Sequence, residues 1–176
     1  KGWIYAQEKD RTVLVSPAGD AMIAFAPAAD ATPEKALEAI DATVKGLDSN
    51  VLLRYILEDD PVWSAPASHF VNVECTRDEP GFINHIVLAE IVWSLRSHPG
   101  FGRARIAKLI GEFIDSDNLV VEDEELVKTA LSLYVEQSAG FTDCLIAVIN
   151  QATRAAPTYS IDKAGVRSKV FVPIKK

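Results

Sequence analysis

The sequence is poor in cysteine, because Cys75 and Cys144 are the only two in 176 residues. They are too few and too far apart for a zinc cluster, and one pair does not make the disulfide framework of a small secreted domain. A reducing compartment fits this usage best, so the expected location is cytoplasmic. A single bridge between the two cysteines stays open as an alternative.

Positive charge is also scarce. The chain carries 18 lysine and arginine residues against 25 aspartate and glutamate residues, which gives a formal net charge of −7. The molecule as a whole therefore does not attract nucleic acid or anionic lipid. Any role in binding phosphate must depend on a local basic rim or on a bound metal ion.

Long hydrophobic runs are missing. A membrane-spanning helix needs about 20 apolar residues, and no segment of the sequence approaches this length, so no membrane association is expected. The segment most similar to the apolar part of a secretory signal is AMIAFAPAA at 21–29. Asp20 and a strand-like segment precede it in place of a basic leader, so we do not interpret it as a signal peptide.

The remaining composition is that of a globular protein, with 48% apolar and 24% charged residues. Because one domain usually has about 100–150 residues, a chain of 176 residues predicts one full domain with an appendage. Residues 1–46 are predicted to form this appendage, whose role is unknown. Three short strand-like runs predict an antiparallel β-meander, and Thr32 followed by Pro33 predicts the start of a helix. Residues 47–176 are predicted to form the main domain.

Strand-like and helix-like segments alternate from residue 47 onward. This pattern predicts an α/β sandwich with a mostly parallel central sheet flanked by helices. The expected strands lie in TVKGLD, GFINH, NLVVED and PTYSID. In the helix after GFINH, the apolar spacing predicts that Leu88, Ile91, Val92 and Leu95 are buried, and we expect Trp93 beside them in the core.

Four carboxylates are expected at the edge where the parallel strands end, which is where such sheets bind ligands. Asp48 and Asp162 follow expected strands, Glu90 lies early in a helix, and Asp143 opens the helix DCLIAVINQA. Clustered acids repel one another, and Mg²⁺ or Mn²⁺, which prefer oxygen ligands, would compensate that repulsion. Each acid alone also has a structural interpretation, such as a helix cap for Asp48. Their predicted convergence favours a metal site.

Four segments, in their order and spacing, resemble a known family. They are LDSNVLLRYILEDDP, FINHIVLAEIVWSLR, GFTDCLIAVINQA and PTYSIDKAG. They resemble the PIN-domain ribonucleases, in particular the VapC-like toxins of bacterial toxin–antitoxin pairs, over roughly residues 44–172. The resemblance implies a PIN-like sandwich in which Asp48, Glu90, Asp143 and Asp162 bind Mg²⁺ or Mn²⁺. The metal would activate water to cleave RNA.

The resemblance has further implications. Asn50 and Ser160 occupy neighbouring positions that would orient a carboxylate or a metal-bound water through hydrogen bonds. An RNA substrate, a small antitoxin protein and a homodimer are the partners that it implies. Gly140 stands where many relatives have an additional acid, so one auxiliary ligand is missing. The extension at residues 1–46 is also unusual for the family.

A second function remains open. A catalytically weak PIN-like interaction module could use the same acidic pocket to bind an arginine of a partner protein. Gly140 and the net negative charge motivate this alternative. A receiver domain that accepts phosphate fits less well, because the expected paired acids and late-strand lysine do not occur at matching positions.

Two other groups of polar residues have structural interpretations. His69, His85 and His98 are not at ligand spacing from one another, so we interpret them as surface or packing residues. The segment EDEELVK at 122–128 reads as the solvated start of a helix, with its acids favourably placed on the helix dipole.

Overall fold

A computed structural model describes residues 4–8, 11–15, 22–25 and 44–175. The chain divides into two units, Lys1–Ala42 and Thr43–Lys176, which are described separately.

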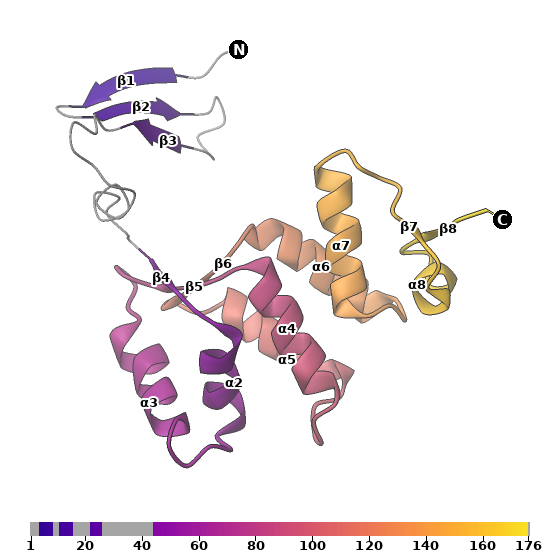
Figure 1. Cartoon of the computed structure of the whole chain (residues 1–176), viewed down its shortest axis with the longest axis horizontal. Helices are drawn as coiled ribbons and strands as arrows, with labels where there is room; N and C mark the ends of the chain where they lie inside the picture. Colours follow the sequence, from indigo (N-terminus) through magenta and orange to yellow (C-terminus); the bar gives the residue numbers. More distant parts are fainter. Residues whose placement is uncertain (1–3, 9–10, 16–21, 26–43, 176) are drawn as a thin grey trace. The chain divides into compact units, whose positions relative to one another are not determined.

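The first unit contains an antiparallel β-meander (Figure 1). Its strands are β1 (Ile4–Glu8), β2 (Arg11–Val15) and β3 (Met22–Phe25), in the order β1-β2-β3. The sequence predicted this meander from its short β-branched runs. The helix expected from Thr32 lies outside the described residues.

The second unit is built on a parallel sheet, as predicted. Its strands are β4 (Lys45–Gly46), β5 (Gly81–Ile83) and β6 (Leu119–Val121), in the order β4-β5-β6. All three strands are short and run parallel. Because they are parallel, their carboxyl ends bring the following residues of the chain to one edge of the sheet.

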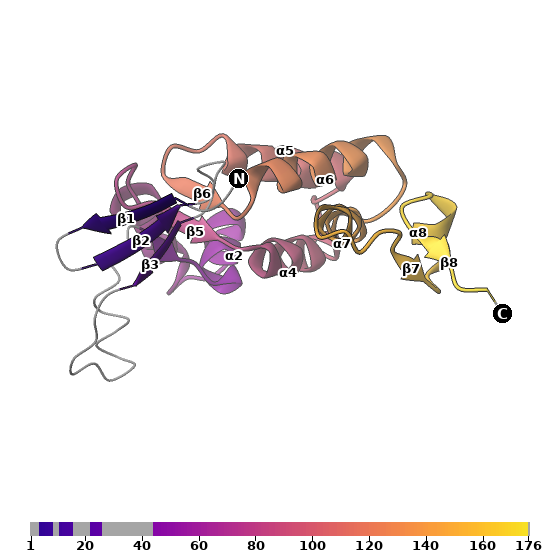
Figure 2. The same cartoon turned by 90° about the horizontal axis from the view of Figure 1, so that it is seen from above.

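Helices flank this sheet. Their bounds are α2 (Ser49–Leu57), α3 (Ser64–His69), the π-helical turn η1 (Phe70–Glu74), α4 (His85–Arg96), α5 (Arg103–Ile114), α6 (Glu124–Glu136) and α7 (Phe141–Ala152). Helices α5 and α6 lie side by side, α2 packs on α4, and α7 packs against both α4 and α6 (Figure 2). None of the described helices is both long and apolar enough to cross a membrane.

Helix α4 shows how the sequence determines an element. Asn84 caps it, because its Oδ1 accepts a hydrogen bond from the backbone N–H of Val87 at 2.9 Å. The four predicted apolar positions, from Leu88 to Leu95, are all buried, which confirms the helical spacing. The prediction for Trp93 was wrong, since its side chain is 74% exposed. One residue along a helix turns the side chain by about 100°, which takes position 93 off the buried face.

Both cysteines are buried and free, so the alternative of a bridge between Cys75 and Cys144 is wrong. Burial raises the pKa of the Cys144 thiol to about 11, and it also raises the pKa of Cys75. Both side chains pack as small apolar groups in the core.

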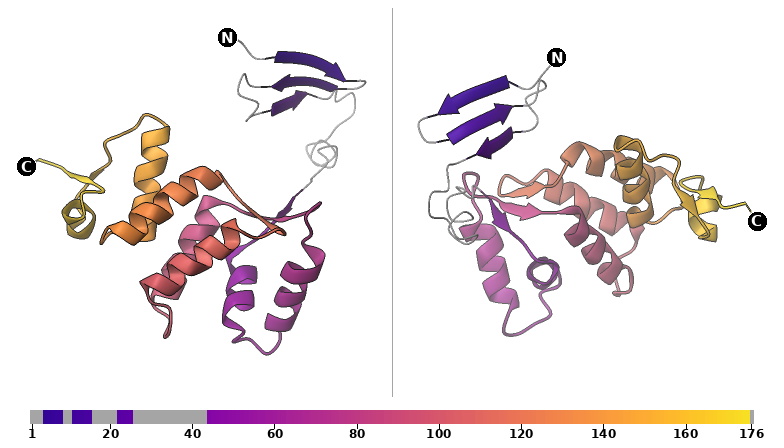
Figure 3. Two further views of the ribbon diagram at one scale, coloured as in Figure 1. Left: turned by 180° about the vertical axis from the view of Figure 1, so that it is seen from behind. Right: turned by 45° about the horizontal axis from the view of Figure 1, so that its top comes forward.

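The last strand differs from the expectation. We expected PTYSID to join the main sheet, but β7 (Tyr159–Ser160) pairs in parallel with β8 (Val172–Pro173) in a separate two-stranded sheet. Helix α8 (Lys163–Arg167) connects the two, and this C-terminal segment lies beyond α7 (Figure 1 and Figure 3). The segment closes on itself because Phe171 packs against Gly165, and a short loop costs little entropy to close.

Candidate metal centre

Asp48 lies two residues after the end of β4 and caps α2. Its Oδ2 accepts hydrogen bonds from the backbone N–H and from Nδ2 of Asn50, both at 3.0 Å. These hydrogen bonds, the backbone one foremost, lower the pKa of the exposed Asp48 carboxyl group. The side chain is therefore an anion at neutral pH. Its Oδ1 receives no hydrogen bond from the residues that the structure describes.

Ser49 links the start of α2 to Glu90 on α4. The Ser49 hydroxyl donates a hydrogen bond of 2.6 Å to Oε2 of Glu90. Ser49 is buried, with 7% of its surface exposed, whereas Glu90 is exposed. The hydrogen bond thus holds an exposed carboxylate at the residue that follows Asp48. The sequence interpretation did not assign this role to Ser49.

Asp143 lies in the first turn of α7. Its Oδ2 accepts a hydrogen bond from the backbone N–H of Gly140 at 3.2 Å, which caps the helix. Asp143 and Glu90 line the same groove between α4 and α7, which has a volume of about 590 Å³. Glu90 therefore contacts Ser49, the residue after Asp48, and shares a groove with Asp143, whereas Asp48 is not among the residues that line this groove.

Asp162 is placed elsewhere. It caps α8, where its Oδ2 accepts a hydrogen bond from the backbone N–H of Gly165 at 2.6 Å. Ser160 acts within the same turn, because its hydroxyl accepts a hydrogen bond from the backbone N–H of Asp162 at 2.9 Å. Since β7 is not part of the main sheet, neither residue follows a strand of that sheet, as Asp48 does.

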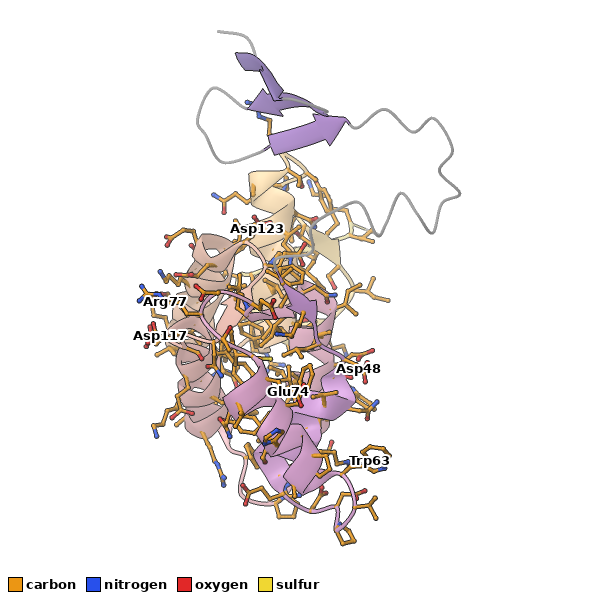
Figure 4. The ribbon with its side chains drawn as sticks, turned by 90° about the vertical axis from the view of Figure 1, so that its left-hand side faces the viewer. Asp48, Trp63, Glu74, Arg77, Asp117 and Asp123 are labelled. Carbon is orange, nitrogen blue, oxygen red and sulfur yellow. The ribbon has the colours of Figure 1, made fainter. Side chains whose placement is uncertain are left out.

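A second group of possible ligands lies after β5 and β6. Within the described part of the chain, His85, Glu122 and Asp123 are the group of three whose ligand atoms all lie within 4.8 Å of one another. Glu122 Oε2 accepts a hydrogen bond from the backbone N–H of His85 at 2.8 Å and lies 3.5 Å from His85 Nδ1. Asp48 and Asp123 are well separated in Figure 4, but His85 lines the same groove as Glu90 and Asp143.

Sequence interpretation missed this second group because it treated the histidines and EDEELVK separately. A detectable signal existed: His85 and Glu122 each follow closely after neighbouring parallel strands, whose carboxyl ends share one edge. The hydrogen bond to the start of α4 gives Glu122 a structural role that needs no ion.

The chemistry of the predicted acids suits a hard divalent cation. Each of Asp48, Glu90 and Asp143 uses one oxygen in a hydrogen bond within the protein. Their second oxygens are the type of ligand that Mg²⁺ and Mn²⁺ prefer. The three carboxylates do not meet the 4.8 Å spacing that the His85 group meets. The structure therefore does not gather these three carboxylates into a direct ligand set for one ion.

A parallel sheet flanked by helices, with acids at the helix starts beside it, defines an α/β domain with a possible metal site. The model of the PIN domain family matches residues 46–156, which is more than half of the chain. The chain therefore belongs to the PIN domain family, whose members are generally metal-dependent nucleases. No curated protein matched the chain, and no solved structure matched it.

Proposed function

We propose that this protein is a Mg²⁺- or Mn²⁺-dependent endoribonuclease, and that it is the VapC-like toxin of a cytoplasmic toxin–antitoxin pair. Membership of the PIN domain family supports nuclease chemistry. The observation that carries the proposal is the hydrogen bond from Ser49 to Glu90, because it joins Glu90 to the residue that follows Asp48. Asp143 supplies a third carboxylate along the same groove.

The proposed reaction is hydrolysis of an RNA phosphodiester with no covalent bond to the protein. A bound Mg²⁺ or Mn²⁺ would activate water for in-line attack and offset charge on the phosphate. Asn50 holds one oxygen of Asp48, and Ser49 holds one oxygen of Glu90. These hydrogen bonds limit the rotation of both carboxylates.

Cleavage of single-stranded RNA with Mg²⁺, with Mn²⁺ and with chelator tests the proposal. Asp48→Asn, Glu90→Gln and Asp143→Asn should each lower cleavage by at least about tenfold, because each removes an anionic metal ligand without changing the size of the side chain. Glu112→Gln is the matched control, since Glu112 lies exposed on α5 and pairs only with Lys108 among the described residues.

Glu122→Gln separates the two acidic groups. We expect it to retain cleavage, because glutamine can still accept the hydrogen bond from the backbone N–H of His85. Loss of cleavage in Glu122→Gln together with full activity in Asp48→Asn would move the metal site to the His85 group. Cleavage that persists in chelator would refute metal dependence itself.

One observation favours a second candidate function, the interaction module whose acidic pocket binds an arginine of a partner. The groove that contains Glu90 and Asp143 is also lined by exposed apolar side chains, namely Ile86, Trp93 and Ile146. Calorimetry distinguishes the two functions. Tight binding of an arginine-bearing peptide without any binding of Mn²⁺ would favour the interaction module.

The proposal includes two protein partners, a small antitoxin and a second copy of this chain. Exposed apolar side chains such as Trp93 and Ile86 are compatible with a protein partner. Light scattering of the purified protein measures its oligomeric state. Co-purification with the product of an adjacent small gene tests for the antitoxin.

A further inference from the structure

Arg96, the last residue of α4, lies next to the proposed metal ligands. Its Nη1 is 3.6 Å from the point that a Cβ atom on Gly140 would occupy. Asp143 Oδ2 is 3.0 Å from the same point. The guanidinium group of Arg96 and the carboxylate of Asp143 therefore approach the backbone of Gly140 together, at the position where a side chain is missing.

Arg96 also joins two hollows of the surface. It lines the groove that contains Glu90 and Asp143, and it lines an adjoining hollow of about 270 Å³ with Arg103, Ser138 and Gly140. Arg96 thus places a positive charge in a groove that also contains Glu90 and Asp143, in a protein whose formal net charge is −7. This is the local positive charge that a phosphate-binding role requires.

The two arginines of the smaller hollow have different roles. Arg103 is held in the fold, because its guanidinium stacks 3.8 Å from the ring centroid of Tyr134 and donates hydrogen bonds to the carbonyl oxygens of Tyr134 and Gln137. Arg96 is exposed and makes no hydrogen bond or ion pair with the residues that the structure describes. Interaction with the dipole of α4 accounts for a basic residue at this position, but it does not occupy the donors of the guanidinium.

We propose that Arg96 binds a phosphate of the RNA backbone beside Asp143. This inference rests on the proposed nuclease function and adds a residue that holds the substrate. A guanidinium group donates two parallel hydrogen bonds to phosphate, which fixes orientation as well as charge. Gly140 keeps Arg96 available for phosphate, because an acid at this position would lie against the Arg96 guanidinium and pair with it.

The experiment measures binding of a short, fluorescently labelled, single-stranded oligoribonucleotide, with Ca²⁺ in place of Mg²⁺ and with gels to verify that the RNA stays intact. Arg96→Gln should raise the Kd about tenfold, as expected when a hydrogen-bonded contact to a charged group is lost. The slope of log Kd against log salt concentration should fall by about one unit. Arg96→Lys keeps the charge but loses the paired hydrogen bonds, so its Kd should lie between the Kd of the wild type and that of Arg96→Gln.

Lys108→Gln is the matched control, because it removes one exposed positive charge on α5 that is paired with Glu112. It should leave both the Kd and the salt slope close to wild-type values. Mn²⁺ affinity and thermal unfolding of Arg96→Gln should also match the wild type, which separates the loss of a phosphate contact from damage to the fold or the metal site.

The two proposals fail in different ways. Equal affinity and equal salt slope for wild type and Arg96→Gln would overturn the phosphate contact, even if the protein cleaves RNA. Absence of oligoribonucleotide binding to the wild type would overturn it as well. Binding that depends on Arg96 in a protein that cleaves no RNA with any divalent metal would support the contact and refute the nuclease.

Discussion

Replacement of Ser49 by alanine tests whether the carboxylates form one unit. The Ser49 hydroxyl is the atom that joins α2 to Glu90, at 2.6 Å from Oε2. Alanine removes this hydroxyl and changes little else, because Ser49 is buried and the missing atom leaves only a small space. The perturbation therefore acts on the position of Glu90 without altering the charge of the site.

The expected magnitude follows from the exposure of the acceptor. A hydrogen bond to a charged group contributes about 1.5–3 kcal/mol to the free energy of unfolding. Glu90 is exposed, so water replaces the lost donor, and we expect a loss of about 1 kcal/mol. Loss of a group that orients a metal ligand lowers metal affinity by about 10–100-fold. Because Glu90 is exposed and one of three acids, the lower end, about tenfold, is expected.

Two measurements on four proteins test this reasoning. Urea denaturation gives the free energy of unfolding, and calorimetry gives the Mn²⁺ affinity, for the wild type, Ser49→Ala, Glu90→Gln and the double variant. The effects on affinity should not add, because both single variants remove the same arrangement. Ser49→Thr should behave like the wild type because it keeps the hydroxyl, and Ser132→Ala controls for loss of an exposed serine on α6.

Additive effects would refute the reasoning. If the double variant lost the sum of the two single losses in Mn²⁺ affinity, Ser49 would act independently of Glu90. If Ser49→Ala lost stability but bound Mn²⁺ like the wild type, the hydrogen bond would be purely structural. Either result would remove the observation that carries the proposed function.

Three further predictions concern other parts of the molecule. Asp162→Asn should leave Mn²⁺ affinity unchanged, because Asp162 caps α8, which connects the strands of the separate C-terminal sheet, and asparagine can also cap a helix. A clear loss of affinity would place Asp162 in the ligand set. Gly81→Ala should destabilise the protein by about 1–3 kcal/mol in urea denaturation, since the new Cβ would lie 2.7 Å from Leu47 Cδ1, whereas Gly111→Ala has free space and should not. The free energy of unfolding should fall as the pH rises from about 9 to 11, because unfolded chains ionise Cys144 near pH 9.0 while burial raises its native pKa to about 11. Cys144→Ala should reduce that slope, and an unchanged slope would contradict the assignment.

Most of the main domain could be predicted from local patterns. The start of α4 was predictable because an asparagine cap precedes apolar residues at helical spacing, and burial from Leu88 to Leu95 follows from that spacing. The parallel sheet was predictable from the alternation of elements, even though β4 has only two residues. A pattern that extends over several turns or several elements still predicts the element correctly when one residue, such as Trp93, is placed on the wrong face.

The pairing of very short strands could not be predicted. Strand β7 has two residues, and no periodicity in a strand of that length indicates whether it pairs with β4 or with β8. In the structure β7 pairs with β8, and Phe171, just before β8, packs against Gly165 of the connecting helix. The expectation that the strand before Asp162 joins the main sheet was wrong for the same reason.

The position of Arg96 beside Gly140 depends on a contact between two helices. The sequence shows Gly140 only as a missing acid, since a glycine has no side chain to suggest a neighbour. Packing of α4 against α7 brings the end of one helix to the start of the other. In the sequence, Gly140 indicates only a missing metal ligand. In the structure, the same position brings Arg96 close to the acidic residue Asp143.

The acids that sit at helix starts have two physical roles that substitution can separate. One oxygen of Asp48 caps α2 and one oxygen of Asp143 caps α7, and these contacts require a hydrogen-bond acceptor but no charge. Asparagine caps helices about as well as aspartate does, so Asp48→Asn should preserve the cap of α2. In Asp143→Asn the amide oxygen can still accept the hydrogen bond from the backbone N–H of Gly140, the N-cap residue of α7. Both variants remove the negative charge. If these variants fold like the wild type and lose Mn²⁺ binding, the charge serves the ion and not the fold. If they unfold at lower urea concentration and bind Mn²⁺ unchanged, the acids are caps alone, and the protein needs another explanation for its acidic groove.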